Sequence, residues 1–134
     1  IWKRLCEYTK FDYLGLQNSG AEAVELLIKT ARKYFHSKGK AEKNRILCIN
    51  SSFHGRTIAT ISAGNNPKHI HGFSPLLEGF DHFEFGNHEQ LKEKISNKHL
   101  NKINTFCPKN GNHRNINTFG TNTKKIMTKA ISFV

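Results

Sequence analysis

The stretch that decides the fold is NSGAEAVE, residues 18–25, in which three small residues stand just before a strongly helical run. From Gly20 to about Tyr34, apolar residues recur three and four positions apart: Val24, Leu27, Ile28, Ala31 and Phe35. This spacing predicts a helix with one apolar face, which Ser37-Lys-Gly39 should end. A short apolar segment, Tyr13–Gln17, comes before it. We therefore expect a strand, a tight turn and a helix in that order.

The rest of the N-terminal part alternates apolar segments with helical ones. We expect strands at residues 45–49 and 81–85, and helices at residues 58–63 and 88–95. Strands that alternate with helices are typical of an α/β protein with a parallel or mixed sheet and helices packed on it. From about residue 97 onward the chain is rich in Lys, Asn and Thr, and only Lys124–Phe133 has a helical rhythm.

Composition limits the class of protein. The 134 residues, 37% of them hydrophobic, suit one globular domain, and no apolar run approaches the length that spans a bilayer. Cys6, Cys48 and Cys107 are widely spaced and form no Cys-x-x-Cys pair, so we expect reduced thiols in a cytoplasmic protein. The net charge of +11 belongs mostly to the C-terminal third, where Glu93 is the only acidic residue after position 91.

The Ser-Gly-Ala turn supports two interpretations. Ser19 and Glu22 have the spacing of a capping box, in which each side chain bonds the backbone N–H of the other residue. The same helix N-terminus presents N–H groups and a partial positive charge that suit a phosphate, and Gly20 and Ala21 keep the approach clear. The sequence contains neither the GxGxxG of a dinucleotide site nor the Gly-Lys-Ser/Thr of a P-loop. Spacing alone leaves both interpretations open.

A second motif, FHGRT at residues 53–57, follows the next expected strand and should lie near the same edge of the sheet. Phe53 could stack on a flat ring, Gly55 would admit a close backbone approach, and Arg56 could grip a carboxylate with two hydrogen bonds. Each residue also has an ordinary role, as a core aromatic, a turn or a surface charge, and a loop histidine such as His54 is usually structural. A phosphate cradle, an aromatic plate and a carboxylate clamp on neighbouring loops form a more specific set.

Together these residues resemble the class-III pyridoxal-phosphate aminotransferases, most closely the acetylornithine/succinyldiaminopimelate type. The resemblance runs from about Leu5 to Lys98 and rests on NSGAEAVE followed by KTARKY, SFHGRTIATISA, GFSPLLEGFDHFEF and EQLKEKIS. It implies that residues 1–98 are part of a large domain of PLP-dependent transferase fold type I. That domain is an α/β unit with a mixed, mostly parallel seven-stranded sheet and flanking helices.

The resemblance also implies a site. The cofactor-binding residues would be Ser19, Gly20, Ala21, Phe53 and His54, of which the first three would hold the phosphate and Phe53 would stack on the pyridine ring. Arg56 would bind the α-carboxylate of the substrate. The family transfers the amino group of N-acetylornithine to 2-oxoglutarate in arginine metabolism. It usually works as a cytosolic homodimer with active sites at the subunit interface, and this dimer is implied for the family rather than for a fragment.

The chain departs from the family after residue 98. The family's Schiff-base lysine and the acidic group at the pyridine nitrogen lie in sequence contexts that these 134 residues do not contain. Where a Glu-Pro-Ile-Gln-Gly-Glu-Gly-Gly-like stretch should follow, the chain reads HLNKINTFCPKN from residue 99. We interpret it as an inactive fragment of a longer protein, frameshifted near residues 97–100, with a disordered or non-native basic tail over residues 99–134. Translation of the surrounding DNA in all frames tests the frameshift.

Two other functions compete with the aminotransferase interpretation. A pI near 9.8 and the basic tail are compatible with a small nucleic-acid-binding protein. The tail contains no recognisable module and few aromatic residues, and such a protein would need nucleic-acid affinity that falls steeply with salt. Metal binding would have to use pairs such as His69 and His71, or Cys107 and His113, whose spacing matches no zinc motif. The aminotransferase interpretation explains more of the sequence than either alternative.

Overall fold

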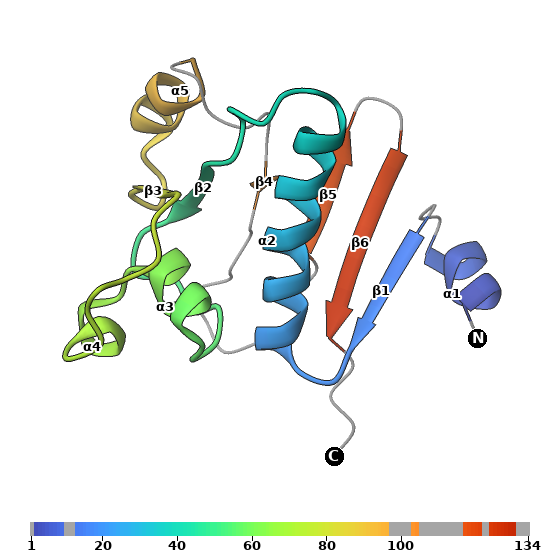
Figure 1. The fold of residues 1–134 in the computed structure, drawn as a ribbon, viewed down its shortest axis with the longest axis horizontal. Helices are drawn as coiled ribbons and strands as arrows, with labels where there is room; N and C mark the ends of the chain where they lie inside the picture. Colours follow the sequence, from blue (N-terminus) through green and yellow to red (C-terminus); the bar gives the residue numbers. More distant parts are fainter. Residues whose placement is uncertain (1, 10–12, 97–102, 105–116, 122–123, 131–134) are drawn as a thin grey trace.

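The computed structural model describes residues 2–9, 13–96, 103–104, 117–121 and 124–130 (Figure 1). In chain order the elements are α1 (Trp2–Thr9), β1 (Tyr13–Gln17), α2 (Gly20–Ser37), β2 (Ile46–Ile49), α3 (Ile58–Gly64), α4 (Pro67–Ile70), β3 (Phe80–Phe83), α5 (His88–Ser96), β4 (Ile103–Asn104), β5 (Asn117–Thr121) and β6 (Lys124–Ala130). The strands and helices predicted between residues 13 and 95 are confirmed, with bounds that differ by a few residues. The short helix α4 was not predicted.

Helix α2 is the central element, and Figure 1 shows it between the β2–β3 pair on one side and β1 and β6 on the other. Its predicted apolar face is buried: Ala23, Val24, Leu27, Ile28, Ala31 and Phe35. The helix ends where the N–H of Lys38 bonds the carbonyls of Tyr34 and Phe35. Helical spacing therefore decided which side of α2 faces the core.

Strands β2 and β3 pair in parallel, with Ile46 opposite Phe80. Their apolar residues meet α2 and α3 in one core cluster: Val24, Leu27, Ile28, Ala31, Phe35, Ile46, Cys48, Ala59, Ala63 and Phe80. Burial of such side chains supplies most of the driving force for packing helices on a sheet. The predicted mixed α/β architecture is confirmed.

A second sheet has the strand order β1-β6-β5-β4, in which β1 and β6 are parallel and the other two pairs are antiparallel. The helical rhythm of Lys124–Phe133 did not produce a helix, because residues 124–130 form β6 and pair with β1 and β5. Backbone pairing with neighbouring strands overrode a weak local periodicity. Apart from β4, β5 and β6, the segment after residue 98 lies outside the described residues, so its predicted disordered or non-native character stays a prediction.

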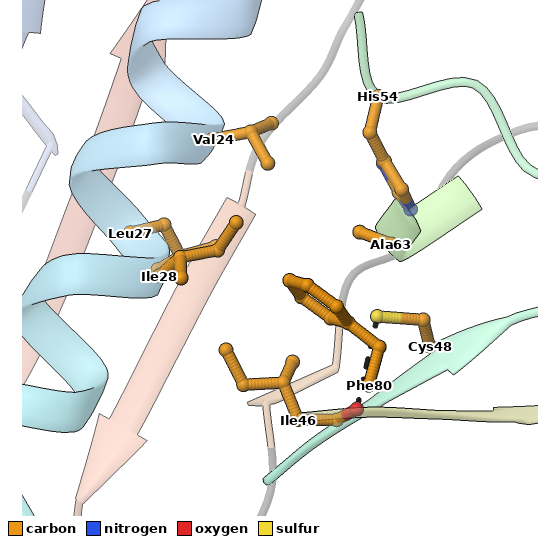
Figure 2. Close-up of a pocket in the computed structure, with 8 residues that line it drawn as sticks. All are labelled: Val24, Leu27, Ile28, Ile46, Cys48, His54, Ala63 and Phe80. Carbon is orange, nitrogen blue, oxygen red and sulfur yellow. Dashed lines mark hydrogen bonds between the residues drawn. The ribbon is translucent and has the colours of Figure 1, made fainter. Parts of the chain in front are cut away.

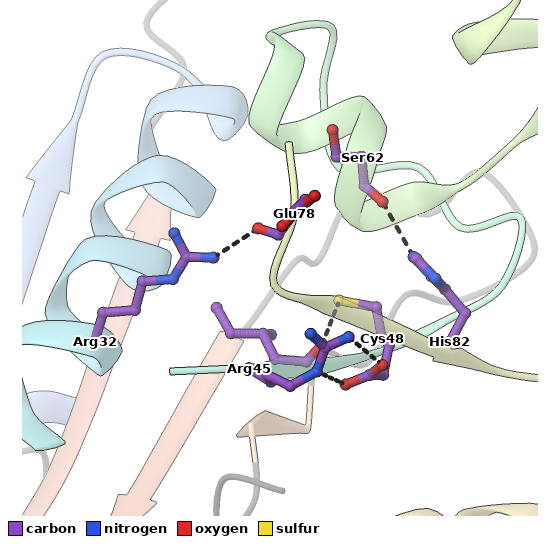
Figure 3. A network of polar contacts seen from close by, with 8 residues as sticks. Arg32, Arg45, Cys48, Ser62, Glu78 and His82 are labelled. Carbon is purple, nitrogen blue, oxygen red and sulfur yellow. Dashed lines mark hydrogen bonds and ion pairs between the residues drawn. The ribbon is translucent and has the colours of Figure 1, made fainter. Parts of the chain in front are cut away.

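Polar contacts tie the loops to this frame (Figure 3). Arg32 on α2 donates to the carbonyl oxygens of Asn44 and Glu78, at 3.2 and 3.3 Å, and so holds the segments that lead into β2 and β3. Arg45 and Asp81 form a two-pronged ion pair between the strands, at 2.7 and 2.6 Å. Within the described ranges, no helix is both long and apolar enough to cross a membrane.

Candidate cofactor site

The two sequence motifs meet at one side of the molecule. The turn from β1 into α2 and the loop from β2 into α3 lie close together, and a Cβ built on Gly55 would stand 2.7 Å from the Cβ of Ala21. Gly55 has φ +120°, a backbone conformation that favours glycine. Glycine therefore lets one motif press directly against the other.

A hydrogen bond joins the same two motifs. Thr57 caps the N-terminus of α3, and its hydroxyl donates to a carboxylate oxygen of Glu25 on α2, at 2.6 Å. Glu25 closes the NSGAEAVE stretch and Thr57 closes FHGRT. This hydrogen bond was not predicted, although a threonine just before a helix is a recognised N-cap signal.

The capping-box interpretation of Ser19 is confirmed. The hydroxyl of Ser19 accepts the N–H of Glu22 at 3.3 Å, and the Glu22 carboxylate accepts the N–H of Ser19 at 2.9 Å. The box leaves other donors available. Among the described residues, no partner is seen for the backbone N–H of Gly20 or Ala21, and the Ser19 hydroxyl still has its own proton to donate.

The geometry at this helix end suits a phosphate. Gly20 is exposed, and a Cβ built on it would meet no atom within 4 Å apart from its own helix and chain neighbours, so the side of the first turn at Gly20 is open. Two N–H groups and one hydroxyl border it, and the helix dipole favours negative charge there. Capping and anion binding are compatible, because they use different donors of the same turn.

Phe53 projects from the loop after β2 and is 51% exposed. The guanidinium of Arg56 lies 5.7 Å from the centre of its ring, and the ring of His69 meets it edge-on at 5.6 Å. The structure thus groups Arg56 with the predicted aromatic plate. His69, on α4, is a further residue beside the Phe53 ring. No sequence signal indicated this contact, because α4 itself was not predicted.

His54 lies on the other side of the loop backbone. It is 7% exposed, and its Nε2 atom is 2.7 Å from the hydroxyl oxygen of Ser52. Burial and, to a smaller extent, the charge of His82 lower the pKa of His54 from 6.5 to about 4. Figure 2 shows its ring beside a small apolar cavity, lined by Val24, Leu27, Ile28, Ile46, Cys48, His54, Ala63 and Phe80. His54 therefore points into the core, away from the exposed face of Phe53.

Comparisons with known proteins show the family of the chain. The family model "Aminotransferase class-III" matches residues 2–115, and the chain therefore belongs to the class-III aminotransferases. The matched range passes residue 98, where the resemblance was expected to stop. Among the structural neighbours, the ornithine aminotransferase of Toxoplasma gondii is similar with a TM-score of 0.67 and 25% identity. That similarity covers 72% of this chain and 24% of the neighbour.

Within this family, the chain is similar to proteins named acetylornithine aminotransferase. The acetylornithine aminotransferase of Agrobacterium fabrum is 52% identical over 94 residues, which are 70% of this chain and 24% of that protein. The acetylornithine aminotransferase of Brucella melitensis is 47% identical over 96 residues, or 72% of this chain and 24% of that protein. The chain thus spans about a quarter of the length of these relatives.

The site fits a flat, phosphorylated cofactor such as pyridoxal phosphate. Gly20 borders the open space that a phosphate would enter, and Phe53 offers a half-exposed ring on the adjoining loop. No carboxylate pairs with Arg56 within the described part of the chain. The described residues also contain no group of three or more His, Cys, Asp or Glu that could hold a metal ion.

Proposed function

We propose that this chain is the phosphate- and ring-binding part of a pyridoxal-phosphate aminotransferase that acts on N-acetylornithine or a related ω-amino donor. The acceptor is 2-oxoglutarate, the setting is arginine biosynthesis in the cytoplasm, and the complete enzyme is a homodimer. The observation that carries the proposal is the close approach of Gly55 to Ala21, because it sets the helix N-terminus and the aromatic loop side by side.

Each residue has a distinct task in this proposal. The N–H groups of Gly20 and Ala21 and the hydroxyl of Ser19 hold the phosphate, and Phe53 supports the ring. Arg56 binds the carboxylate of the substrate, for which its planar guanidinium is well shaped. When bound, pyridoxal phosphate supplies an electron-poor ring that withdraws negative charge from the reacting carbon. His54 remains a predicted cofactor residue, but its burial supports an indirect contribution.

By itself, the chain is proposed to be inactive. Transamination needs a lysine that bonds the cofactor and moves protons, and an acidic group at the pyridine nitrogen. The sequence contexts that carry these groups in the family do not occur in the 134 residues. We expect no turnover of N-acetylornithine and no absorbance band of a lysine-bound cofactor in the purified chain. Detectable turnover, or that band, would contradict this part of the proposal.

The phosphate site can be tested by NMR titration of the 15N- and 13C-labelled chain with inorganic phosphate and with pyridoxal phosphate. Both ligands should shift the amide signals of Gly20 and Ala21, and only pyridoxal phosphate should shift the Phe53 ring. The decisive variant is Gly20→Pro, because proline is tolerated at the first position of a helix and lacks the N–H donor.

The matched control is Gly20→Ala, which keeps the N–H and places its methyl group in open space. Ser19 already has extended backbone angles, φ −135° and ψ 165°, which suit a residue before proline. Gly20→Pro should therefore keep the fold and weaken phosphate binding, whereas Gly20→Ala should retain it. Equal binding by the two variants would show that this N–H does not contact phosphate.

A further inference from the structure

We propose that Ser52 and His54 act together as positioning residues, which hold the backbone of Phe53 so that its ring stays exposed beside Arg56 and His69, available to a cofactor ring. The inference rests on the proposed function, since it assigns a task toward the same cofactor. Neither residue touches the cofactor in this arrangement. Their contribution is to the direction and rigidity of the aromatic plate.

Burial alternates along this segment. Ser52 is 8% exposed, Phe53 is 51% exposed and His54 is 7% exposed. This buried–exposed–buried pattern resembles the alternation of side chains along a strand, and two inward anchors on either side of Phe53 would direct its ring outward. Loss of either anchor would free the backbone on one side of Phe53.

Ser52 and His54, the two anchors, are linked by consecutive hydrogen bonds whose directions can be assigned. The hydroxyl of Ser52 donates to the carbonyl oxygen of Ile49, the last residue of β2, at 2.7 Å. A serine hydroxyl has one proton, so at the contact with His54 the oxygen of Ser52 must accept. Nε2 of His54 therefore carries the proton and donates over 2.7 Å. This chain links the end of β2 to the residue that follows Phe53.

The charge state of His54 is compatible with this task. Because burial lowers its pKa to about 4, the ring is neutral near pH 7, and the Nε2–H tautomer can persist. The nearby His82 is held separately, by hydrogen bonds from its Nε2 to the carbonyl oxygens of Ser62 and Ala63, at 3.0 and 3.1 Å. His54 is thus a neutral donor with one partner, Ser52, among the described contacts.

Backbone packing fixes the same segment at both ends. The carbonyl oxygen of Ser52 lies where a Cβ on Gly64 would stand, so the loop presses on the end of α3. Gly55 presses in the same way on Ala21 at the start of α2. Packing against α3 and α2 thus already holds both ends of the loop. The specific contribution of Ser52 and His54 is to set the direction of the Phe53 ring.

The experiment compares two ligands on four variants by NMR titration. Pyridoxine 5′-phosphate has a ring and a phosphate but no aldehyde, so it cannot bond a lysine, and inorganic phosphate reports the cradle alone. Ser52→Ala and His54→Leu should weaken binding of pyridoxine 5′-phosphate by about five- to tenfold, the size of one lost ring contact. Their affinity for inorganic phosphate should stay unchanged.

Two further variants separate positioning from general damage. His54→Gln can donate an N–H to Ser52 and should recover most of the lost affinity for pyridoxine 5′-phosphate. Ser62→Ala removes another buried serine hydroxyl, on α3, where Ser62 is 3% exposed. This hydroxyl donates to the carbonyl oxygen of Ile58 and accepts the N–H of Leu77, so its loss also disturbs buried hydrogen bonds, but the variant should bind both ligands like the wild type. Equal weakening of both ligands in Ser52→Ala, or unchanged binding of both, would overturn the inference.

Failure of the proposed function would look different. If the wild-type chain binds neither ligand, the phosphate site is wrong, and the inference is then judged by the ring contact between Phe53 and His69. The nuclear Overhauser effect between these rings should be present in the wild type and Ser62→Ala and lost in Ser52→Ala. Its survival in Ser52→Ala would show that the anchors do not direct the Phe53 ring.

Discussion

Substitution of Gly55 by alanine should break the contact that joins the two motifs. The new Cβ would lie 2.7 Å from the Cβ of Ala21, 3.0 Å from its Cα and 3.1 Å from the hydroxyl oxygen of Thr60. Two of these atoms belong to Ala21, which has no flexible side chain to move aside. At φ +120° a residue with a Cβ is also strained.

The two costs can be estimated separately. Backbone strain of this kind costs about 1–3 kcal/mol. Overpacking of a fixed contact costs about 1–3 kcal/mol more. We therefore expect Gly55→Ala to lower the free energy of unfolding by roughly 2–6 kcal/mol, the sum of these two ranges. This is a large share of the stability of an ordinary domain.

Three other glycines serve as matched controls. Gly39 has φ +69° and open space around its Cβ position, so Gly39→Ala should pay only for strain, about 1–2 kcal/mol. Gly15 has no such φ and would meet only the flexible end of Leu26, at 2.5 Å, so Gly15→Ala should cost about 1 kcal/mol. Gly20→Ala has neither problem and should leave stability nearly unchanged.

Urea unfolding followed by far-UV circular dichroism measures all four variants under one condition. We expect Gly55→Ala to have a much lower free energy of unfolding than the other three variants. If Gly55→Ala shows no folded baseline, the substitution has lowered the free energy of unfolding by at least the whole wild-type value. A Gly55→Ala variant no less stable than Gly39→Ala would refute the close packing of the two motifs. The ligand titrations should show the same variant losing phosphate binding.

Three further predictions concern other groups of the site and core. Ser19→Ala should lower the free energy of unfolding by about 1 kcal/mol, because the Glu22 N–H loses its acceptor, whereas Ser19→Thr should lose less; urea midpoints check this. Between about pH 7 and pH 5, unfolding should become easier by about 2 kcal/mol, because the unfolded chain protonates His54 near pH 6.5 and the folded chain only near pH 4. This part of the loss should vanish in His54→Gln, and its persistence there would assign it to other groups. Burial raises the pKa of Cys48 to about 12, so iodoacetamide should label it more than about 100-fold more slowly in the folded chain than in urea, as peptide mass spectrometry can measure. Rapid labelling of Cys48 under native conditions would mean that this part of the core opens.

Several features of the molecule could be predicted because they depend on neighbours in the chain. The capping box needs only Ser19 and Glu22 three residues apart, and the apolar face of α2 needs only helical spacing. Apart from the short helix α4, the order of strands and helices between residues 13 and 95 follows from the same local patterns. The segment after residue 98 has no strong local pattern, and residues 124–130 became a strand through pairing with β1 and β5.

The sequence by itself determined the turn, the helix and the residue types at the candidate site. It could not determine which way each side chain of the FHGRT loop points, because that depends on contacts between distant segments. Only the tertiary structure turned His54 toward Ser52 and the core and left Phe53 beside Arg56 and His69. Desolvation makes the difference: a neutral, hydrogen-bonded imidazole can be buried beside α2, and the aromatic ring between the two anchors is then left at the surface.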